Sequence, residues 1–112
     1  MDIKDYSVIN DIIGSWKKDG CRSIAVIGKT SNECENLRNR IGSRPPVISE
    51  KTQDYEGGIL IVPSYLAKGL EFDGVIISDV SMYSNESLDI KLLYIAMTRA
   101  LHKLAVLRRE IC

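Results

Sequence analysis

The sequence has no excess of charge of either sign, no long apolar run and no secretory signal. Lys and Arg together number 15, and so do Asp and Glu, in a chain of 112 residues. This balance excludes the strong basic field of an autonomous nucleic-acid-binding protein, so any such contact has to be local. No apolar stretch approaches the roughly 20 residues that span a membrane. We therefore expect a cytoplasmic protein without a membrane partner.

Cysteine and histidine are scarce, which argues against several kinds of site. Cys21, Cys34 and Cys112 are far apart and lack CxxC spacing, so neither a disulfide framework nor a zinc site is expected. His102 is the only histidine, and no serine, cysteine or second-histidine motif of a hydrolase stands near it. We predict no metal site within this chain.

A phosphate-binding P-loop is also missing. Gly28-Lys29-Thr30 looks like the end of such a loop, but the motif requires a glycine five positions before Gly28, where Ser23 stands. Residues 23–27 are moreover needed as a strand, so no glycine-rich loop can cradle phosphates. Because a Walker B segment with its glutamate base is not recognisable either, no complete ATPase site is expected.

Segments with helical spacing alternate with short apolar runs along the chain. Residues 1–20 carry apolar side chains at helical spacing and end in two lysines and a glycine, which predicts an amphipathic N-terminal helix. Several later runs are apolar without alternation, as in a parallel sheet that helices cover on both faces. Strands are expected at 23–27, 47–48, 59–62, 75–77 and 104–107, helices at 33–41 and 86–102, and a polar connection at 49–58.

The order of these elements predicts a single domain of α/β class over residues 1–112, with an open, mainly parallel sheet. Ligands of such sheets bind beyond the carboxyl ends of the strands, which directs attention to the loops after Ile27 and Val62. In the first of these loops, Lys29 could present a cation at the sheet edge or be a solvated lysine in a turn.

In the second loop, Pro63 cannot donate to a sheet ladder and is expected to turn the chain outward. This would place Tyr65, Lys68 and Glu71 near the sheet edge. The Tyr65 ring could stack on a base or sugar, or it could pack under the loop.

The expected helix at 86–102 has two apolar arcs, and Arg99 stands in line with the second. Arg99 could cap helix carbonyls or pair with Glu71 or Asp73. Alternatively, its forked and permanently charged guanidinium could bind phosphate oxygens and stabilise charge in phosphoryl transfer. The first arc comprises Ile90, Leu93, Met97, Ala100 and Leu101, and the second comprises Leu88, Leu92 and Ile95.

Two short segments give the chain a family resemblance. Lys68-Gly69-Leu70-Glu71-Phe72-Asp73 resembles the fifth motif of UvrD/Rep-type superfamily I DNA helicases, and Leu93-Tyr94-Ile95-Ala96-Met97-Thr98-Arg99-Ala100 resembles the sixth. Residues 27–32 are similar to the fourth motif. The resemblance implies the second, RecA-like (P-loop NTPase-like) domain of an ATP-dependent DNA helicase, as the C-terminal part of a longer chain.

The resemblance also implies roles for individual residues. Arg99 would be the catalytic arginine finger. ATP would be bound by Lys29, Gly69, Glu71 and Arg99. Single-stranded DNA would be bound by Ser64, Tyr65 and Lys68. ATP and Mg²⁺ would be shared with a missing N-terminal RecA-like domain that carries the metal ligands, so the isolated chain would not hydrolyse ATP.

The string from Pro63 to Asp73 has Pro-Ser-Tyr where better-known members of the family have Thr-x-His. It is closer to the helicase IV-like (HelD-like) branch, some of whose members act on RNA polymerase, which makes the polymerase a second expected partner. The alternative from a different class is a non-catalytic protein-interaction module. Such a module would bind polymerase or another protein through the exposed arc of Leu88, Leu92 and Ile95.

Overall fold

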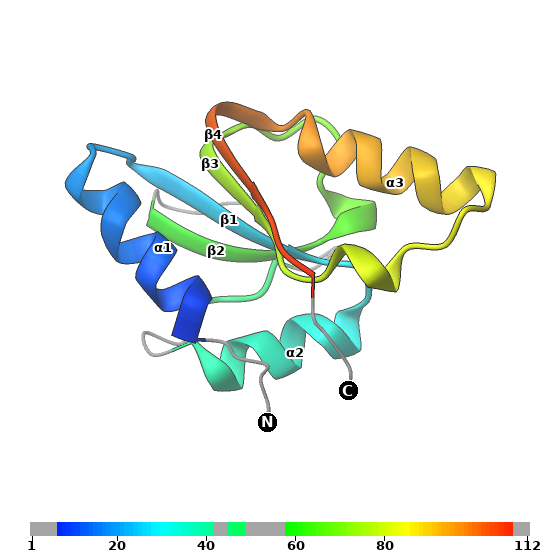
Figure 1. Ribbon diagram of the computed structural model, residues 1–112, viewed down its shortest axis with the longest axis horizontal. Coiled ribbons are helices and arrows are strands. Elements are labelled where there is room, and N and C mark those ends of the chain that lie inside the picture. The colour runs from blue at the N-terminus through cyan, green and yellow to red at the C-terminus, as the bar shows by residue number, and fades with distance from the viewer. Residues whose placement is uncertain (1–6, 42–44, 49–57, 109–112) are drawn as a thin grey trace.

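Four parallel strands form the central sheet, in the order β2-β1-β3-β4. The computed structural model describes residues 7–41, 45–48 and 58–108. The strands are β1 (Ser23–Gly28), β2 (Gly58–Pro63), β3 (Phe72–Ile77) and β4 (Ala100–Val106). All of them pair in parallel, so the predicted α/β class with an open parallel sheet is confirmed (Figure 1).

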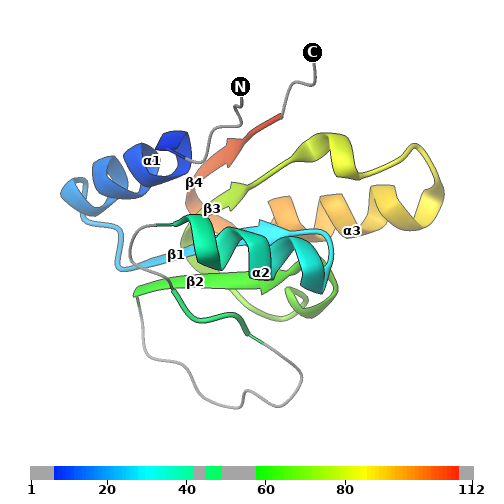
Figure 2. The same ribbon diagram turned by 90° about the horizontal axis from the view of Figure 1, so that it is seen from below.

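Helices cover both faces of this sheet, as Figure 2 shows from below. α1 (Ser7–Lys18) and α2 (Ser31–Arg40) pack on one face, and α3 (Ser87–Met97) packs on the other. Neighbouring residues of β1 serve the two cores in turn, since Ile24 and Val26 face α1 and α2, whereas Ala25 and Ile27 face the side of α3. Both faces of β1 are buried, and its sequence is therefore apolar without alternation.

Local sequence signals explain where the first two helices begin and end. α1 ends in Lys17 and Lys18, followed by Gly20 with a φ of +97°, a left-handed conformation that favours glycine. α2 begins after Thr30, whose side chain accepts a hydrogen bond from the Glu33 N–H. Two short 3₁₀ turns, η1 (Ser64–Leu66) and η2 (Val80–Met82), follow β2 and β3.

Gly74 allows α1 to lie close to β3. A Cβ added at Gly74 would stand 2.5 Å from Cε3 of Trp16, so the indole ring occupies the space that any larger residue would need. Trp16 packs against the core on this face of the sheet. The close approach of the helix therefore depends on the missing side chain.

The helix predicted over 86–102 is five residues shorter at its C-terminal end, which corrects the sequence interpretation. α3 ends at Met97, and Ala100 already pairs with Phe72 as the first residue of β4. Periodicity alone could not detect this change, because the apolar residues of the edge strand continue the helical pattern. Leu101 and His102 consequently lie on a strand, Arg99 lies in the turn before it, and Ile90 of the first arc is 53% exposed.

Two other predictions meet the limits of the described residues. The short strand expected at 47–48 is present as a single parallel bridge between Val47 and Ile61. The polar connection at 49–58 is described only at Gly58, which starts β2, and residues 1–6 of the predicted N-terminal helix lie outside the described part.

Candidate functional site

The predicted site residues lie at two opposite edges of the sheet. Lys29 follows the last residue of β1, and Ser64 follows the last residue of β2, at the carboxyl edge. Glu71 precedes β3 and Arg99 precedes β4, at the amino edge. Strands of this length span roughly 17–20 Å. The structure therefore does not bring Lys29 together with Glu71 and Arg99, and Glu71 does not share an edge with Tyr65 as the sequence interpretation expected.

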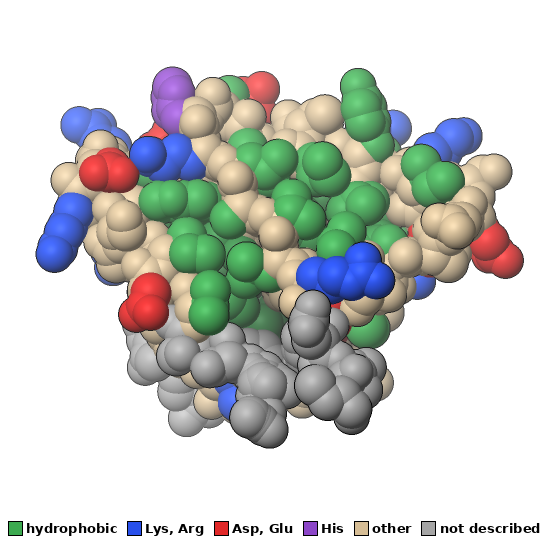
Figure 3. Space-filling model, in the orientation of Figure 1, with side chains coloured by type: hydrophobic (Ala, Val, Ile, Leu, Met, Phe, Trp, Pro, Cys, Tyr) green, Lys and Arg blue, Asp and Glu red, His purple; other side chains and the backbone are tan. Residues whose placement is uncertain are grey.

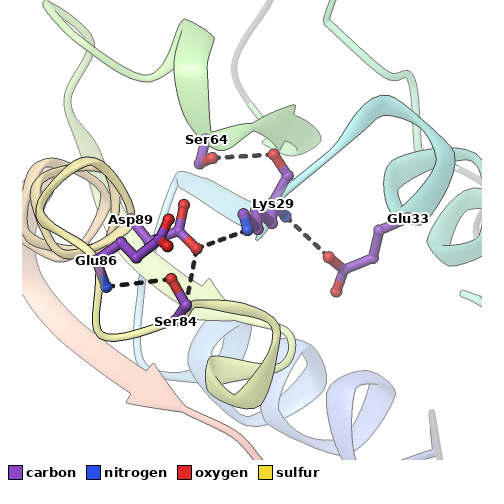
Figure 4. Close-up of polar contacts among 6 residues, drawn as sticks. All are labelled: Lys29, Glu33, Ser64, Ser84, Glu86 and Asp89. Atoms are coloured by element: carbon purple, nitrogen blue, oxygen red, sulfur yellow. Dashed lines mark hydrogen bonds and ion pairs between the residues drawn. The ribbon is translucent and has the colours of Figure 1, made fainter.

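Lys29 is held at the carboxyl edge by an acid that the sequence interpretation did not consider. Its Nζ lies 2.7 Å from Oδ2 of Asp89, in the first turn of α3 (Figure 4). The same oxygen accepts the backbone N–H of Ser84 at 2.8 Å. The Lys29 ammonium, together with the Ser84 donors, lowers the pKa of Asp89 to about 2. The ammonium also lies 5.9 Å from the centroid of the Tyr83 ring.

The backbone of Lys29 is fixed from two sides. Its N–H donates to Oε1 of Glu33 at 2.8 Å, and its carbonyl oxygen accepts the hydroxyl of Ser64 at 3.0 Å (Figure 4). The other carboxylate oxygen of Glu33 accepts the hydroxyl of Ser78. Glu33 is 6% exposed, and its burial raises the pKa of the carboxyl group above the usual range. A buried polar network thus positions the start of the loop.

The three residues predicted to contact DNA differ in their availability. Ser64 is 1% exposed, and its hydroxyl is engaged by Lys29. Tyr65 is 49% exposed, with its hydroxyl 2.9 Å from the Ser31 Oγ. Lys68 is exposed, and Gly69 beside it has a φ of +84° with open space where a Cβ would stand. Tyr65 and Lys68 can therefore meet a ligand directly, and a DNA contact for all three stays a prediction.

Arg99 at the amino edge caps the helix that precedes it. Its Nε–H donates to the carbonyl of Ile95 at 3.1 Å, and one terminal nitrogen donates to Thr98 Oγ1 at 3.2 Å. The capping alternative is thus observed, whereas within the described residues Arg99 forms no ion pair with Glu71 or Asp73. A guanidinium has five N–H donors. Two of its nitrogens are engaged, which leaves donors for an incoming anion.

A hollow of about 300 Å³ lies at the same edge, on the side of α1. Asp73 contributes a carboxylate that accepts the N–H of Arg22 at 2.7 Å and of Ser23 at 3.3 Å. These donors lower the pKa of Asp73 below its usual range. Across the hollow, Lys103 forms an ion pair with Asp19 at 3.1 Å. The lining residues are Asp19, Gly20, Cys21, Arg22, Asp73, His102 and Lys103.

The match to a known family covers the two strings from which these sites were predicted. Residues 58–107 match the UvrD-like helicase C-terminal domain, a stretch that includes Lys68–Asp73 and the turn with Arg99. Residues 58–107 are therefore similar to that domain. The resemblance to UvrD-type helicases is confirmed, whereas the HelD-like branch stays a prediction.

A solved structure supports the same relationship for the UvrD-like chain. It is similar to the C-terminal domain of a possible DNA helicase from Lactobacillus plantarum WCFS1, with 32% identity and a TM-score of 0.74. The match covers 91% of this chain but 65% of that one, so the UvrD-like chain spans about two thirds of its relative. No curated protein matches. The predicted RecA-like helicase fold is confirmed by this likeness.

Apolar side chains are exposed on the face of the UvrD-like domain that carries β4 and α3 (Figure 3). The predicted arc contributes unequally, since Leu88 is 68% exposed, whereas Leu92 and Ile95 are half-buried. The exposed large apolar residues of the two elements are Leu88, Ile90, Tyr94, Leu101, Leu104 and Val106. A surface of this kind is typical of an interface with another domain or protein.

Sequence reasoning missed Glu33 and Asp89, the two acids that bond to Lys29 at the carboxyl edge. Glu33 stands three residues after Thr30, the spacing of a capping box, and this signal could have identified its position. Asp89 gave no comparable signal, because its partner is 60 residues away in the sequence. Two absences also hold for the described ranges: no helix is long and apolar enough to cross a membrane, and no group of three His, Cys, Asp or Glu could hold a metal ion.

Proposed function

We propose that this chain is the second RecA-like motor domain of an ATP-dependent DNA helicase. One observation carries the proposal. Glu71 and Arg99 come from two different motifs, yet they open neighbouring parallel strands at one edge, where the Phe72 N–H donates to the Arg99 carbonyl at 3.0 Å. An exposed glutamate and a partly exposed arginine thus lie on neighbouring strands at one edge, and their side chains are of the types that bind a nucleotide's sugar and phosphates.

In this proposal the amino edge supplies part of an ATP site. Glu71 accepts a ribose hydroxyl, the open space at Gly69 permits close approach, and the remaining donors of Arg99 stabilise charge on the transferring phosphoryl group. Mg²⁺, when bound with ATP, would neutralise the phosphate oxygens. Its ligands and the P-loop belong to the N-terminal RecA-like domain, so the chain alone has no ATPase activity. The exposed apolar face of α3 and β4 supports such a partner domain.

The carboxyl edge faces single-stranded DNA in this proposal. Tyr65 is exposed there, and an exposed tyrosine ring suits stacking on a base, while Lys68 is exposed on the segment that leads from this edge back to the start of β3. We assign Lys29 to this polynucleotide side, because it lies at the edge opposite Glu71 and Arg99. Closure of the two RecA-like domains on nucleotide, and their opening after hydrolysis, would move the cytoplasmic enzyme along the strand.

The test is ATP turnover by the longer protein that contains this chain, with and without single-stranded DNA. Arg99→Ala and Glu71→Ala are compared with wild type, and Lys91→Ala serves as a control because it removes an exposed cation from α3. We expect Arg99→Ala to lower kcat by about 10³-fold or more, a loss typical of a missing arginine finger, and Lys91→Ala to leave it unchanged. Unchanged turnover in Arg99→Ala with an intact fold would contradict the proposal.

The exposed apolar face of α3 and β4 favours a second candidate, a non-catalytic protein-interaction module. RNA polymerase, which the HelD-like resemblance implies, is the first partner to test. Binding of purified polymerase that Leu88→Glu abolishes and Arg99→Ala preserves would support the module. Polymerase binding that neither substitution affects, or no binding at all, would speak against it.

A further inference from the structure

An acidic side chain neutralises the best-placed cation of the carboxyl edge. Lys29 lies in the loop after β1, and Asp89 lies in the first turn of α3, so their 2.7 Å ion pair joins two separate elements. Figure 4 shows the two side chains pointing toward each other across the edge. A polynucleotide that approaches this edge therefore meets a lysine whose charge is already compensated.

The ion pair is open enough for exchange. The side chains of Lys29 and Asp89 keep 24% and 14% of their exposure, and water can replace either partner. Asp89 would not lose all its partners, because the Ser84 N–H donates to the same carboxylate oxygen. An ion pair between partly exposed groups is weak compared with a buried one, since solvent screens both charges.

The lysine can change partners without a change in the fold. Its backbone is fixed by Glu33 on the N–H side and by Ser64 on the carbonyl side, whereas its four-carbon side chain rotates. The ammonium already lies over the Tyr83 ring, which offers a second favourable contact while the acid is exchanged. The backbone of Lys29 is thus held in place, whereas its ammonium group can move to another partner.

We propose that Asp89 competes with the phosphodiester of single-stranded DNA for the Lys29 ammonium and thereby sets the affinity of this edge for the strand. The inference rests on the proposed function, because it takes the carboxyl edge as the polynucleotide surface. Without DNA, the carboxylate neutralises Lys29. With DNA, a phosphate takes the ammonium, and Asp89 stays on the Ser84 N–H. The acid also repels the phosphate, so the edge holds the strand weakly, as suits a motor that must release it repeatedly.

The test is binding of a fluorescein-labelled dT20 oligonucleotide to the 112-residue chain at several salt concentrations. Asp89→Asn keeps an oxygen for Ser84 and removes the charge. We expect it to bind about two- to fivefold more tightly, the scale of an exposed ion pair, with a steeper salt dependence. Lys29→Gln should weaken binding, and Asp89→Asn should give no gain in that background. Asp11→Asn, at an exposed acid of α1, controls for net charge.

Several outcomes would overturn the inference. One is an equal gain in dT20 affinity for Asp89→Asn and Asp11→Asn. Another is a gain in affinity for Asp89→Asn that persists when Lys29→Gln is also present. Neither result would contradict the proposal that the carboxyl edge binds DNA. A third is tighter binding of ATP rather than dT20 by Asp89→Asn, which would return Lys29 to the nucleotide. If neither wild type nor Asp89→Asn binds dT20 at low salt, the polynucleotide part of the proposed function fails as well.

A measurement on the unmodified chain does not depend on how the variants fold. The ¹³C signal of the Asp89 carboxyl group should shift as dT20 is added, because its ammonium partner leaves. The carboxyl signal of Asp11 should stay in place. A constant Asp89 signal at saturating dT20 would overturn the inference even if DNA binds.

Discussion

The two edges of the sheet differ in how far their polar groups are satisfied within the chain. At the carboxyl edge, Lys29, Glu33 and Ser64 share one network of hydrogen bonds. At the amino edge, the Glu71 carboxylate forms no hydrogen bond or ion pair in the part of the chain that the structure describes, and the Arg99 side chain bonds only to its own helix end. The polar groups around Lys29 are thus satisfied within the domain, whereas the Glu71 carboxylate and part of the Arg99 guanidinium stay available to a ligand. A shared ATP site would need this arrangement.

The largest expected effect comes from breaking the amino edge at Phe72. This side chain is fully buried at the start of β3, directly after Glu71, and its N–H bonds the Arg99 carbonyl. Phe72→Ala should lower the free energy of unfolding by about 3–5 kcal/mol. Urea denaturation measures the loss, with Leu104→Ala, at a position 41% exposed on β4, as the milder control. Similar losses in both variants would show that Phe72 does not anchor this edge.

The next largest effect concerns the packing of α1 against β3. Gly74→Ala would place a Cβ 2.5 Å from the Trp16 ring, and we expect a loss of about 1–3 kcal/mol from overpacking. Gly14→Ala is the matched control, because nothing lies within 4 Å of its added Cβ on α1. That change should stabilise the helix by about 0.5–1 kcal/mol. A gain in stability for Gly74→Ala, or no difference between the two variants, would contradict the close approach of Trp16 to β3.

The elements that formed as predicted are those whose signal is local. The apolar run of β1 and the lysines and glycine that end α1 follow from short stretches of sequence, and both appear in the structure. The end of α3 does not follow in this way. Ala100 leaves the helix because Phe72 pairs with it, and only the neighbouring strand specifies that contact.

In the candidate site, too, the features that local sequence specifies were predicted, and those that depend on distant residues were not. Glu71 and Arg99 were identified from short sequence motifs. Whether a residue lies at the amino or the carboxyl edge of the sheet, however, depends on whether it precedes or follows a strand. Lys29 was assigned to the nucleotide because residues 27–32 resemble the fourth helicase motif, and the strand register places it at the edge opposite Glu71 and Arg99. Its partner Asp89 lies 60 residues away, so no local pattern could reveal the ion pair.

The pH dependence of stability separates Glu33 and Asp89, the two acids that bond to Lys29 at the carboxyl edge. Burial raises the pKa of Glu33 above 4.5, so above that pH the folded chain binds more protons than the unfolded chain. The free energy of unfolding should therefore be highest below pH 4.5 and fall as the pH rises through the folded pKa. Glu33→Gln should lack this decline in urea titrations between about pH 4 and 8. Parallel curves for the two proteins would contradict the burial of an ionisable group.

Asp89 acts in the opposite sense and in a different window. Its pKa is lowered from 3.8 to about 2, so its contribution is complete above pH 3.8 and is lost as the pH falls toward 2. Asp89→Asn should remove this acid-sensitive part of the stability. The same variant should keep the decline above pH 4.5 that Glu33 causes. If the difference in stability between wild type and Asp89→Asn stayed constant from about pH 4 down to about pH 2, the ion pair with Lys29 would not be its source.

The smallest expected effect on stability tests how the carboxyl edge meets a strand. The Tyr65 hydroxyl lies 2.9 Å from Ser31 Oγ in an exposed contact, so Tyr65→Phe should cost about 0.5 kcal/mol or less.

If the half-exposed ring stacks on a base, Tyr65→Phe should bind dT20 as wild type does, because the ring face is unchanged. Tyr65→Ala should then weaken binding by about 1–3 kcal/mol in fluorescence anisotropy. A loss that already appears in Tyr65→Phe would instead assign recognition to the hydroxyl and its contact with α2. Equal binding by all three proteins would show that the ring only covers the loop, and the carboxyl edge would then depend on Lys29 for its contact with DNA.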